Sequence, residues 1–412
     1  MLNNDGKIQN TLFTGDNLFV LKGLNSKSVD LIYLDPPFNS KRMYSAPIGS
    51  KAAGSSFKDM WTWSDINEAY LENLIQNYPS LVNFIKSVSS ISGDDMTAYL
   101  TYMAQRIIEM HRILKDTGSF YLHCDPTASH YLKIILDEIF GKENFQNEII
   151  WQYYMGGKPS KAFARKHDVI LFYSKSNNKN RYFEKIKVKR YLDFKPSLKD
   201  ESKEAESGKD EFGYYSVIQC PDVWQIKSVF NMSKEATGYP TQKPLDLLKR
   251  IILASTKSND IVLDPFCGCA TTCVAAQQLG RKWIGIDIEE KAVEVLIERL
   301  SGDAGIFSNF VARSDVPQRT DIKIEPIVKQ TKEQLFVEQK GCCNGCGGNF
   351  EIWNFEVDHI VPKTKGGGDY YENYQLLCGS CNRIKGNRPM EYLKIKIQAR
   401  LEAIKHKLKF CE

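Results

Sequence analysis

The chain has 412 residues, enough for a sizeable buried core and one or two smaller modules, and its composition is ordinary, with 42% hydrophobic and 25% charged residues. No apolar run approaches the ~18 residues of a membrane-spanning helix, and the N-terminus lacks a basic segment followed by an apolar one. From these features we expect neither a membrane protein nor a secreted one, but a cytoplasmic protein with reduced thiols. The net charge of +5 suits a polyanionic partner without requiring one.

Strand and helix signals alternate in the first half of the chain. The apolar run Val29–Leu34 ends at two prolines, which predicts a buried strand that opens into a loop. Helical spacing follows at 96–114, then a strand at 119–123 and a helix at 127–140. This alternation is typical of a parallel sheet flanked by helices.

The same alternation returns in the second half of the chain. The predicted elements there are two helices, at 244–255 and 271–279, and two strands, at 261–263 and 283–287. Both halves should join in one Rossmann-like, doubly wound α/β sheet. The polar segment 175–235 and the connector 300–340 show no sustained period, so we expect irregular structure in both.

The tetrapeptide Asp35-Pro36-Pro37-Phe38 follows the first predicted strand. The two prolines fix the backbone, so the Asp35 carboxylate and the Pro36 carbonyl can act as two rigidly placed hydrogen-bond acceptors. Two acceptors that bind the hydrogens of a base amino group aim the nitrogen lone pair at an electrophilic methyl carbon. Phe38 offers a flat face on which an extruded base can stack. The alternative is a simple strand-ending turn.

A second loop follows a predicted strand and opens a helix. It supplies Asp264, Pro265, Phe266, Gly268 and Thr271. Small residues let a ligand approach the backbone, and the free N–H groups of a helix N-terminus suit a carboxylate. Asp287 ends the next strand, where acidic residues bind ribose hydroxyls in nucleotide-binding folds. A single glycine turn is weak evidence, but its combination with Asp287 and the upstream tetrapeptide predicts a nucleotide-like cofactor site.

Together these motifs resemble the amino-group DNA methyltransferases of the circularly permuted β type, in which the catalytic motif precedes the cofactor motif. Further matches within residues 12–298 are the stretches 14–18, 122–132 and 238–244. The resemblance implies methyl transfer from S-adenosylmethionine to an amino nitrogen of double-stranded DNA. It also implies that Asp16 lines the adenine part of the cofactor site, and that Thr241 and Lys243 close over its methionine end.

The resemblance leaves two points open. Asp-Pro-Pro-Phe is commoner in members that act on adenine N6 and Ser-Pro-Pro in members that act on cytosine N4, so we favour N6-adenine, with N4-cytosine as the alternative. The family usually carries glycine where this chain has Ala270. If that position needs a positive φ, a methyl group there costs on the order of 1 kcal/mol and would weaken cofactor binding.

The predicted organisation has six parts. They are the catalytic half (1–154), a target-recognition region (155–235), the cofactor half (236–300), a linker (301–340), a cysteine-rich module (341–389) and a basic C-terminal helix (390–412). In the target-recognition region, basic residues at 185–190 interleave with Tyr191, Phe194 and later tyrosines, which suits phosphate contacts and stacking on a flipped base. A solvated charged surface is the alternative.

Two Cys-x-x-Cys pairs lie near the C-terminus. They consist of Cys343, Cys346, Cys378 and Cys381, with Cys342 beside the first pair leaving its register ambiguous. In a reducing compartment four thiolates in this pattern predict a tetrahedral structural Zn²⁺, which would hold together a segment too small for a large core. The alternative is a set of unrelated reduced cysteines.

Residues 341–389 resemble the HNH nuclease module. The resemblance implies a small zinc-stabilised ββα domain in which His359 acts as general base on a water molecule. Asp358 and Asn382 would hold one divalent ion, Mg²⁺, and Asn373 would orient the imidazole. Many members carry histidine where this chain has Asn382, so cleavage is less firmly implied than the fold.

The leading interpretation is a modification enzyme fused to a nuclease, so that one chain both methylates and cuts DNA. One alternative makes the C-terminal module a zinc-stabilised DNA clamp without cleavage. Another makes the whole chain a non-catalytic DNA-binding protein with a decayed cofactor site. An RNA substrate and association into a homodimer also stay open.

Overall fold

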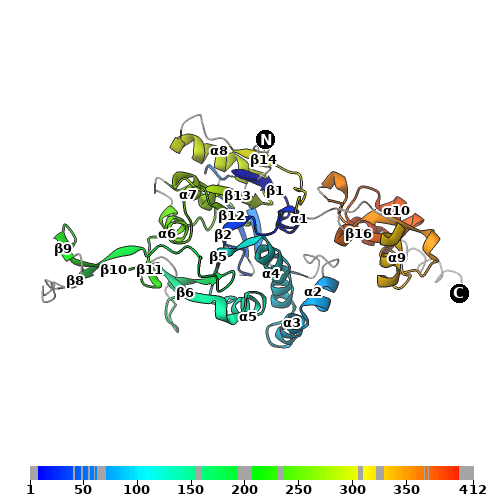
Figure 1. Ribbon diagram of the computed structural model, residues 1–412, viewed down its shortest axis with the longest axis horizontal. Helices are drawn as coiled ribbons and strands as arrows, with labels where there is room; N and C mark the ends of the chain where they lie inside the picture. The colour runs from blue at the N-terminus through cyan, green and yellow to red at the C-terminus, as the bar shows by residue number, and fades with distance from the viewer. Residues whose placement is uncertain are drawn as a thin grey trace.

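The structure, a computed structural model, describes residues 8–39, 42–47, 50–53, 56–59, 61–62, 71–153, 159–193, 207–230, 233, 235–304, 310–321, 329–365, 367–369 and 371–398. Within these residues, nine strands form one mixed sheet in the order β11-β6-β7-β5-β2-β12-β13-β1-β14 (Figure 1). They are β1 (Thr11–Thr14), β2 (Val29–Leu34), β5 (Leu114–Cys124), β6 (Phe145–Gln152), β7 (His167–Ser174), β11 (Val223–Gln225), β12 (Ile261–Asp264), β13 (Lys282–Asp287) and β14 (Val311–Arg313). β7 is antiparallel to both of its neighbours, and the other pairings in this sheet are parallel.

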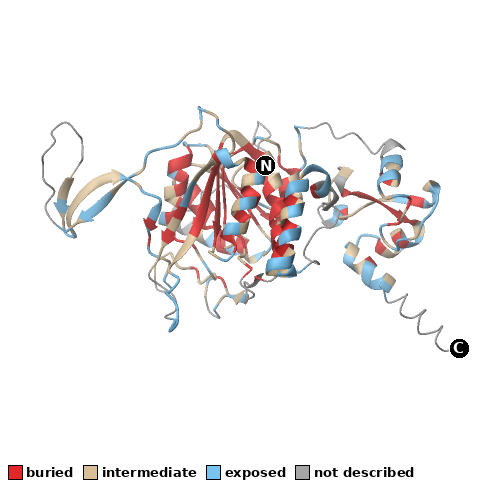
Figure 2. Ribbon diagram, turned by 90° about the horizontal axis from the view of Figure 1, so that it is seen from below, coloured by how far each residue is buried: buried red, intermediate tan, exposed pale blue. Residues whose placement is uncertain are grey.

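Helices cover both faces of this sheet, which confirms the predicted doubly wound α/β fold (Figure 1). One face carries α1 (Asn17–Gly23), α2 (Leu71–Asn77), α3 (Pro79–Ser92), α4 (Asp94–Ile113) and α5 (Ser129–Phe140), and the other carries α6 (Leu245–Ser255), α7 (Thr271–Gln278) and α8 (Lys291–Ala304). Successive side chains of a strand point to opposite faces, so Ile32 packs with the first set of helices and Leu31 with the second. Figure 2 shows the buried sheet between these two layers.

Neighbouring strands bring the two sequence motifs together. β2 and β12 are parallel, with Leu31 opposite Val262 and Ile32 opposite Leu263. β13 lies on the other side of β12 in the same direction. The loops that follow these strands therefore meet at one edge of the sheet, which is where ligands bind in open α/β folds.

The range 155–235 divides into two structurally different parts. β7 and β11 lie within this range and belong to the central sheet, where β7 pairs with β5 and β11 pairs with β6. The remainder contains a separate antiparallel sheet of β8 (Lys187–Leu192), β10 (Gly213–Gln219) and β9 (Ser207–Asp210), which extends from the body in Figure 1. The sequence predicted irregular structure here. Neither face of this small sheet is buried, so its strands lack the apolar alternation by which a half-buried strand is recognised.

The predicted linker is largely structured. Its start continues α8 to residue 304, and β14 then adds an edge strand beside β1. Further on, the side chain of Asp321 accepts a hydrogen bond from the backbone N–H of Ser26 at 2.9 Å. The connector therefore stays attached to the sheet domain as far as residue 321, and α9 (Lys329–Glu338) begins the next unit.

The C-terminal module has its own small core and lies beyond α1 in Figure 1. β15 (Phe355–His359) and β16 (Tyr374–Cys378) form an antiparallel pair followed by α10 (Gly379–Lys385), which confirms the expected ββα order. Residues 390–398 are helical, and the rest of the predicted C-terminal helix lies outside the described residues. Among the helices that the structure describes, none combines the length and the apolar character required to cross a membrane.

Candidate active site

A cavity of about 660 Å³ opens at the edge of the sheet where β2, β12 and β13 end. This volume is typical of a pocket for a small molecule. Its lining includes every residue that the sequence assigned to methyl transfer or cofactor binding: Asp16, Asp35, Pro36, Pro37, Phe38, Thr241, Lys243, Asp264, Pro265, Phe266, Gly268, Thr271 and Asp287. The two motifs thus share one cavity, although more than half of the chain separates the first from the last of these residues.

Asp35 has two differently placed carboxylate oxygens. Its Oδ2 accepts a hydrogen bond from the Lys243 ammonium at 2.5 Å, in an ion pair whose side chains are only 17% and 9% exposed. Among the described residues, its Oδ1 is buried and has no hydrogen-bond partner. A buried acceptor without a partner is costly, so this oxygen is suited to receive an N–H from a ligand.

A buried histidine contacts Phe38 in the loop that follows β2. His123, at the end of β5, contacts the Tyr33 hydroxyl through Nδ1 at 2.9 Å and the Asp168 carboxylate through Nε2 at 3.2 Å. Its ring lies 5.9 Å from the Phe38 ring, at an angle of 31°. Burial acts to raise the pKa of Asp168, but hydrogen bonds from His123 and Tyr153 outweigh it and hold that pKa below its ordinary value. The network fixes the position of the aromatic ring beside Asp35.

Two buried carboxyl groups, those of Asp264 and Asp287, line the cavity. Burial raises the pKa of Asp264 to about 7 and the pKa of Asp287 to about 6. Asp264 accepts hydrogen bonds from Thr272 Oγ1 and from the backbone N–H of Phe266. The two oxygens of Asp287 accept from the N–H groups of Gly268, at 2.7 Å, and Glu289, at 2.9 Å. A cationic ligand would favour the ionised form of both carboxyl groups.

In the loop that precedes α7, two residues have positive φ. Gly268 has φ of +51°, and a Cβ atom there would lie 3.0 Å from the Tyr239 ring. Ala270 has φ of +57° and is fully buried at the N-cap of α7. Position 270 therefore does have a positive φ, and its alanine occupies the left-handed region that favours glycine. Arg299 secures the loop by donating to the Cys269 carbonyl and to Thr271 Oγ1.

Asp16 caps α1 by accepting from the N–H of Leu18 at 2.9 Å. The same oxygen accepts from Arg106 Nη2 at 2.7 Å, and Arg106 Nε donates to Asn17 at 2.5 Å. The guanidinium is 3% exposed and stacks 3.2 Å from the centre of the Tyr102 ring. α4 therefore anchors the start of α1 at the cavity wall.

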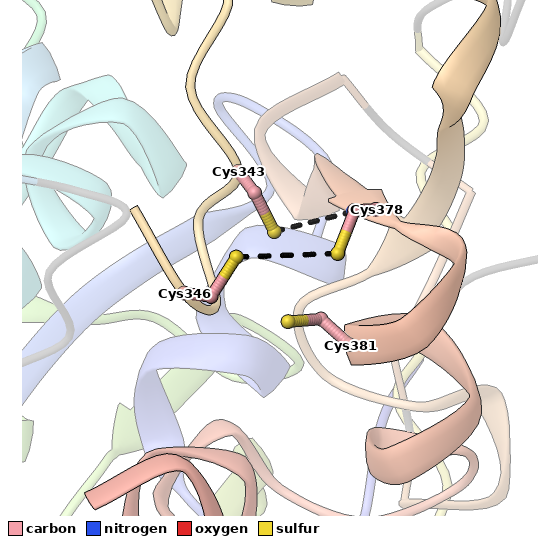
Figure 3. Close-up of side chains that lie close together, drawn as sticks. All are labelled: Cys343, Cys346, Cys378 and Cys381. Atoms are coloured by element: carbon pink, nitrogen blue, oxygen red, sulfur yellow. Dashed lines mark hydrogen bonds between the residues drawn. The ribbon is translucent and has the colours of Figure 1, made fainter. Parts of the chain in front are cut away.

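The four predicted zinc ligands converge in the C-terminal module (Figure 3). The sulfur atoms of Cys343, Cys346, Cys378 and Cys381 all lie within 4.8 Å of one another. Burial raises the pKa of Cys343, but N–H groups directed at its sulfur outweigh this and lower that pKa. Four thiol groups at this separation fit a tetrahedral Zn²⁺. Cys342 is not in the cluster, which resolves the register of the first pair.

The predicted base of the nuclease half is held by a residue that the sequence reading missed. His359 Nε2 lies 2.7 Å from Asp369 Oδ1, and Tyr374 and Lys363 also donate to that carboxylate. Burial raises the pKa of Asp369, but these hydrogen bonds outweigh it and hold that pKa at about 2. Asn373 was expected to orient the imidazole, but it bonds instead to the backbone of Val361 and Gly368 and pins the loop after β15.

The two residues assigned to Mg²⁺ have protein partners in this structure. Asp358 accepts from the buried Lys385 ammonium at 2.9 Å and from Gln375 at 2.9 Å. Asn382 donates to Glu356. An ammonium already neutralises Asp358, so this arrangement does not fit a divalent cation unless the Lys385 contact opens. Asp358 and Asn382 are therefore both present, but their side chains are bound to protein partners and are not arranged around a metal position.

Two protein families match this chain, one over the sheet domain and one over the C-terminal module. The profile of the family described as "DNA methylase" matches residues 29–298, and the profile described as "HNH endonuclease" matches residues 343–388. The chain belongs to the DNA methylase family. It is 30% identical to the DNA adenine methyltransferase YhdJ of Escherichia coli (strain K12) over 72% of this chain and 84% of that protein. It is 28% identical to the type II methyltransferase M.BglII of Bacillus subtilis over 71% of that protein and 73% of this chain.

Solved structures also resemble this methylase. The crystal structure of an M1.HpyAVI–SAM complex matches 70% of this chain and 98% of that chain, with 20% identity and a TM-score of 0.40.

Four residues in or next to the methylase cavity were not singled out from the sequence: Tyr33, Arg106, His123 and Asp168. Each lies inside a strand or helix, where a polar residue has no spacing that separates it from a structural one. For His123 alone the sequence gave a signal, because it lies in the stretch 122–132 that matches the methyltransferase family.

Proposed function

We propose that the chain is an S-adenosylmethionine-dependent methyltransferase that modifies adenine N6 in double-stranded DNA. The observation that carries this proposal is that Asp35, whose buried Oδ1 has no hydrogen-bond partner among the described residues, lines one cavity together with Asp264 and Asp287. S-adenosylmethionine supplies a methyl carbon made electrophilic by the attached sulfonium. The carboxyl groups of Asp264 and Asp287 suit a positively charged ligand of this kind.

The remaining residues act on the base. Phe38 stacks on the extruded ring, while Asp35 Oδ1 and the Pro36 carbonyl accept the two amino hydrogens. Held in this way, the nitrogen lone pair would point at the methyl carbon that S-adenosylmethionine supplies, so that an N–C bond could form as the S–C bond breaks toward sulfur and the nitrogen gives up one proton to solvent. The aspartate in the tetrapeptide favours adenine over cytosine, and the similarity to an adenine methyltransferase points in the same direction.

Labelled S-adenosylmethionine and unmethylated double-stranded DNA test this proposal. Digestion to nucleosides should give labelled N6-methyladenine, and Asp35→Ala should abolish the label with cofactor binding retained. Labelled N4-methylcytosine would instead support the alternative base. Equal labelling of single-stranded RNA would contradict the assignment to DNA.

We assign DNA recognition to the projecting sheet of β8, β9 and β10. Lys187 and Arg190 are exposed on β8, whereas Lys189 is held by Asp210 at 2.8 Å and is less available to a phosphate. Charge-to-alanine changes at Lys187 and Arg190 should weaken DNA binding and reduce its salt dependence. Lys133→Ala on α5 serves as the control, and an unchanged salt slope in the two β8 variants would argue for a merely solvated face.

We further propose that the HNH module cleaves DNA, so that one chain holds both activities of a restriction–modification system. His359 would take a proton from the attacking water, oriented by Asp369. A plasmid incubated with the protein and Mg²⁺, with and without S-adenosylmethionine, tests cleavage and its control by methylation. His359→Ala should remove cutting and retain methylation, and Asp35→Ala should do the reverse. DNA binding without breaks under any condition would favour a zinc-stabilised clamp.

A further inference from the structure

Lys243 lies at the catalytic end of the cavity. The sequence placed it with Thr241 in a turn over the methionine end of the cofactor. In the structure its ammonium bonds Asp35 Oδ2 at 2.5 Å and lies 5.4 Å from the centre of the Phe38 ring. Both contacts are to residues of the catalytic tetrapeptide.

The ion pair is well protected from water. The Lys243 side chain is 9% exposed and that of Asp35 is 17% exposed, so solvent screens their attraction less than at a surface. The Lys243 ammonium also donates weakly to the Thr241 carbonyl at 3.4 Å, which ties it to its own turn. A carboxylate held this way at one oxygen cannot rotate freely about χ2.

The second oxygen is oriented by what surrounds it. Asp35 Oδ1 lies 4.0 Å from His123 Nδ1, which is beyond hydrogen-bonding distance. That nitrogen faces the Tyr33 hydroxyl, and the other ring nitrogen faces Asp168. His123 is therefore committed elsewhere, and Oδ1 remains a buried acceptor without a hydrogen-bond partner among the described residues, on a side chain that lines the cavity.

We propose that Lys243 is a positioning residue for methyl transfer: it occupies Asp35 Oδ2 and thereby presents Oδ1 as the acceptor for one N–H of the target amino group. This inference rests on the proposed methyltransferase function and assigns Lys243 to the base side of the site. Lys243 acts through Asp35, so its loss should lower the rate of methyl transfer and leave cofactor affinity unchanged.

The test measures turnover and binding separately. Lys243→Met should lower the methyl-transfer rate at saturating DNA and S-adenosylmethionine by roughly 100-fold, because a misplaced acceptor loses its orientation. The dissociation constants for S-adenosylmethionine and for DNA, measured by calorimetry and by anisotropy, should stay within about twofold of those of the unmodified protein. Lys243→Arg should recover part of the rate, since it restores the charge with a different geometry.

A double-mutant cycle and a matched control make the outcome decisive. In an Asp35→Asn background Lys243→Met should cause little additional loss, because a residue that acts through Asp35 has nothing left to position. Lys27→Met, which removes a lysine from an exposed pair with Asp116, should behave like the unmodified protein. If Lys243→Met does not fold, the milder Lys243→Arg and Lys243→Gln variants take its place in the cycle.

The inference is overturned if Lys243 variants lose cofactor affinity in proportion to their rate, which would make the lysine a cofactor ligand. It is also overturned if they retain full turnover, or if their losses add to that of Asp35→Asn. Failure of the unmodified protein to methylate any DNA would count against the proposed function and is distinguishable from each of these results.

Discussion

The side-chain amide of Asn17 donates a hydrogen bond of 2.7 Å to the backbone carbonyl of Pro265, 248 residues further along the chain. It joins the start of α1 to the loop that precedes α7, and Arg106 donates to the amide oxygen of the same side chain. This part of the cavity wall is thus assembled from three separate parts of the sequence. Its shape depends on buried polar contacts between them.

Arg106→Met should therefore affect both stability and cofactor binding. Asp16 and Asn17 would lose their buried partner, and we expect a loss of about 1–3 kcal/mol in the free energy of unfolding, because Asp16 itself is partly exposed. Denaturant unfolding and calorimetry with S-adenosylmethionine measure the two effects. Lys51→Met, which breaks an exposed pair with Glu298, should change stability by less than ~0.5 kcal/mol. Equal effects of the two variants would contradict the role given to Arg106.

The affinity for S-adenosylmethionine should increase with pH. The pKa values of Asp264 and Asp287 in the free protein are about 7 and about 6, so both carboxyl groups take up protons as the pH falls from 8 to 5. A bound sulfonium favours their ionised forms, and affinity should fall as the pH decreases, by up to roughly tenfold per pH unit for each carboxyl group. Calorimetry at several pH values measures this. S-adenosylhomocysteine, which lacks the sulfonium charge, should show a weaker dependence.

The same two groups affect the stability of the free protein in the opposite direction. Their pKa values in the folded state lie above the ordinary value of 3.8, so the stability they contribute is present below about pH 4 and is lost as the pH rises through 6 to 7. The rise in melting temperature on adding S-adenosylmethionine should consequently be larger at pH 8 than at pH 5.5. An equal rise at both values would show that these carboxyl groups do not interact with the ligand's charge.

Ala270→Gly should stabilise the protein. Glycine adopts the observed φ of +57° without the Cβ strain of alanine, and we expect a gain on the order of 1 kcal/mol in the free energy of unfolding. Cofactor affinity should rise or stay constant. Ala275→Gly, in the interior of α7, is the matched control and should destabilise by about 1 kcal/mol. A loss of stability in both variants would contradict the strain at Ala270.

Removing metal from the C-terminal module should separate the two halves of the protein. Cys381→Ser should lose bound Zn²⁺, measured by elemental analysis, and become sensitive to proteolysis after residue 329, because the small core depends on the metal. Methylation by residues 29–298 should persist. Cys342→Ser, which changes a cysteine outside the cluster, should keep the metal. Metal loss in both variants would point to a different ligand set.

The sequence predicted the fold and the composition of the methylase cavity because both depend on local signals. Apolar runs marked the strands, and Asp35 and Asp264 stand where those strands end. Partner choice was less predictable. Asn373 was assigned to an imidazole but bonds to the backbone of Val361 and Gly368, and the bond from Lys243 to Asp35 was not foreseen, since sequence spacing does not show which of several nearby polar groups a side chain meets. In the small sheet at 187–219, the alternation at 185–190 indicated one strand, but its sheet partners were missed because these strands bury neither face.

The position of that small sheet has a consequence for how such a protein can diversify. It leaves the central sheet after β7 and returns at β11, at the opposite edge from β13 and β1. Its residues can therefore change without disturbing the loops that line the cavity. Under the proposed function one recognition element serves both modification and cutting, so a change of specificity alters the two together. A cell that acquires a new variant then protects the same sites that the variant attacks.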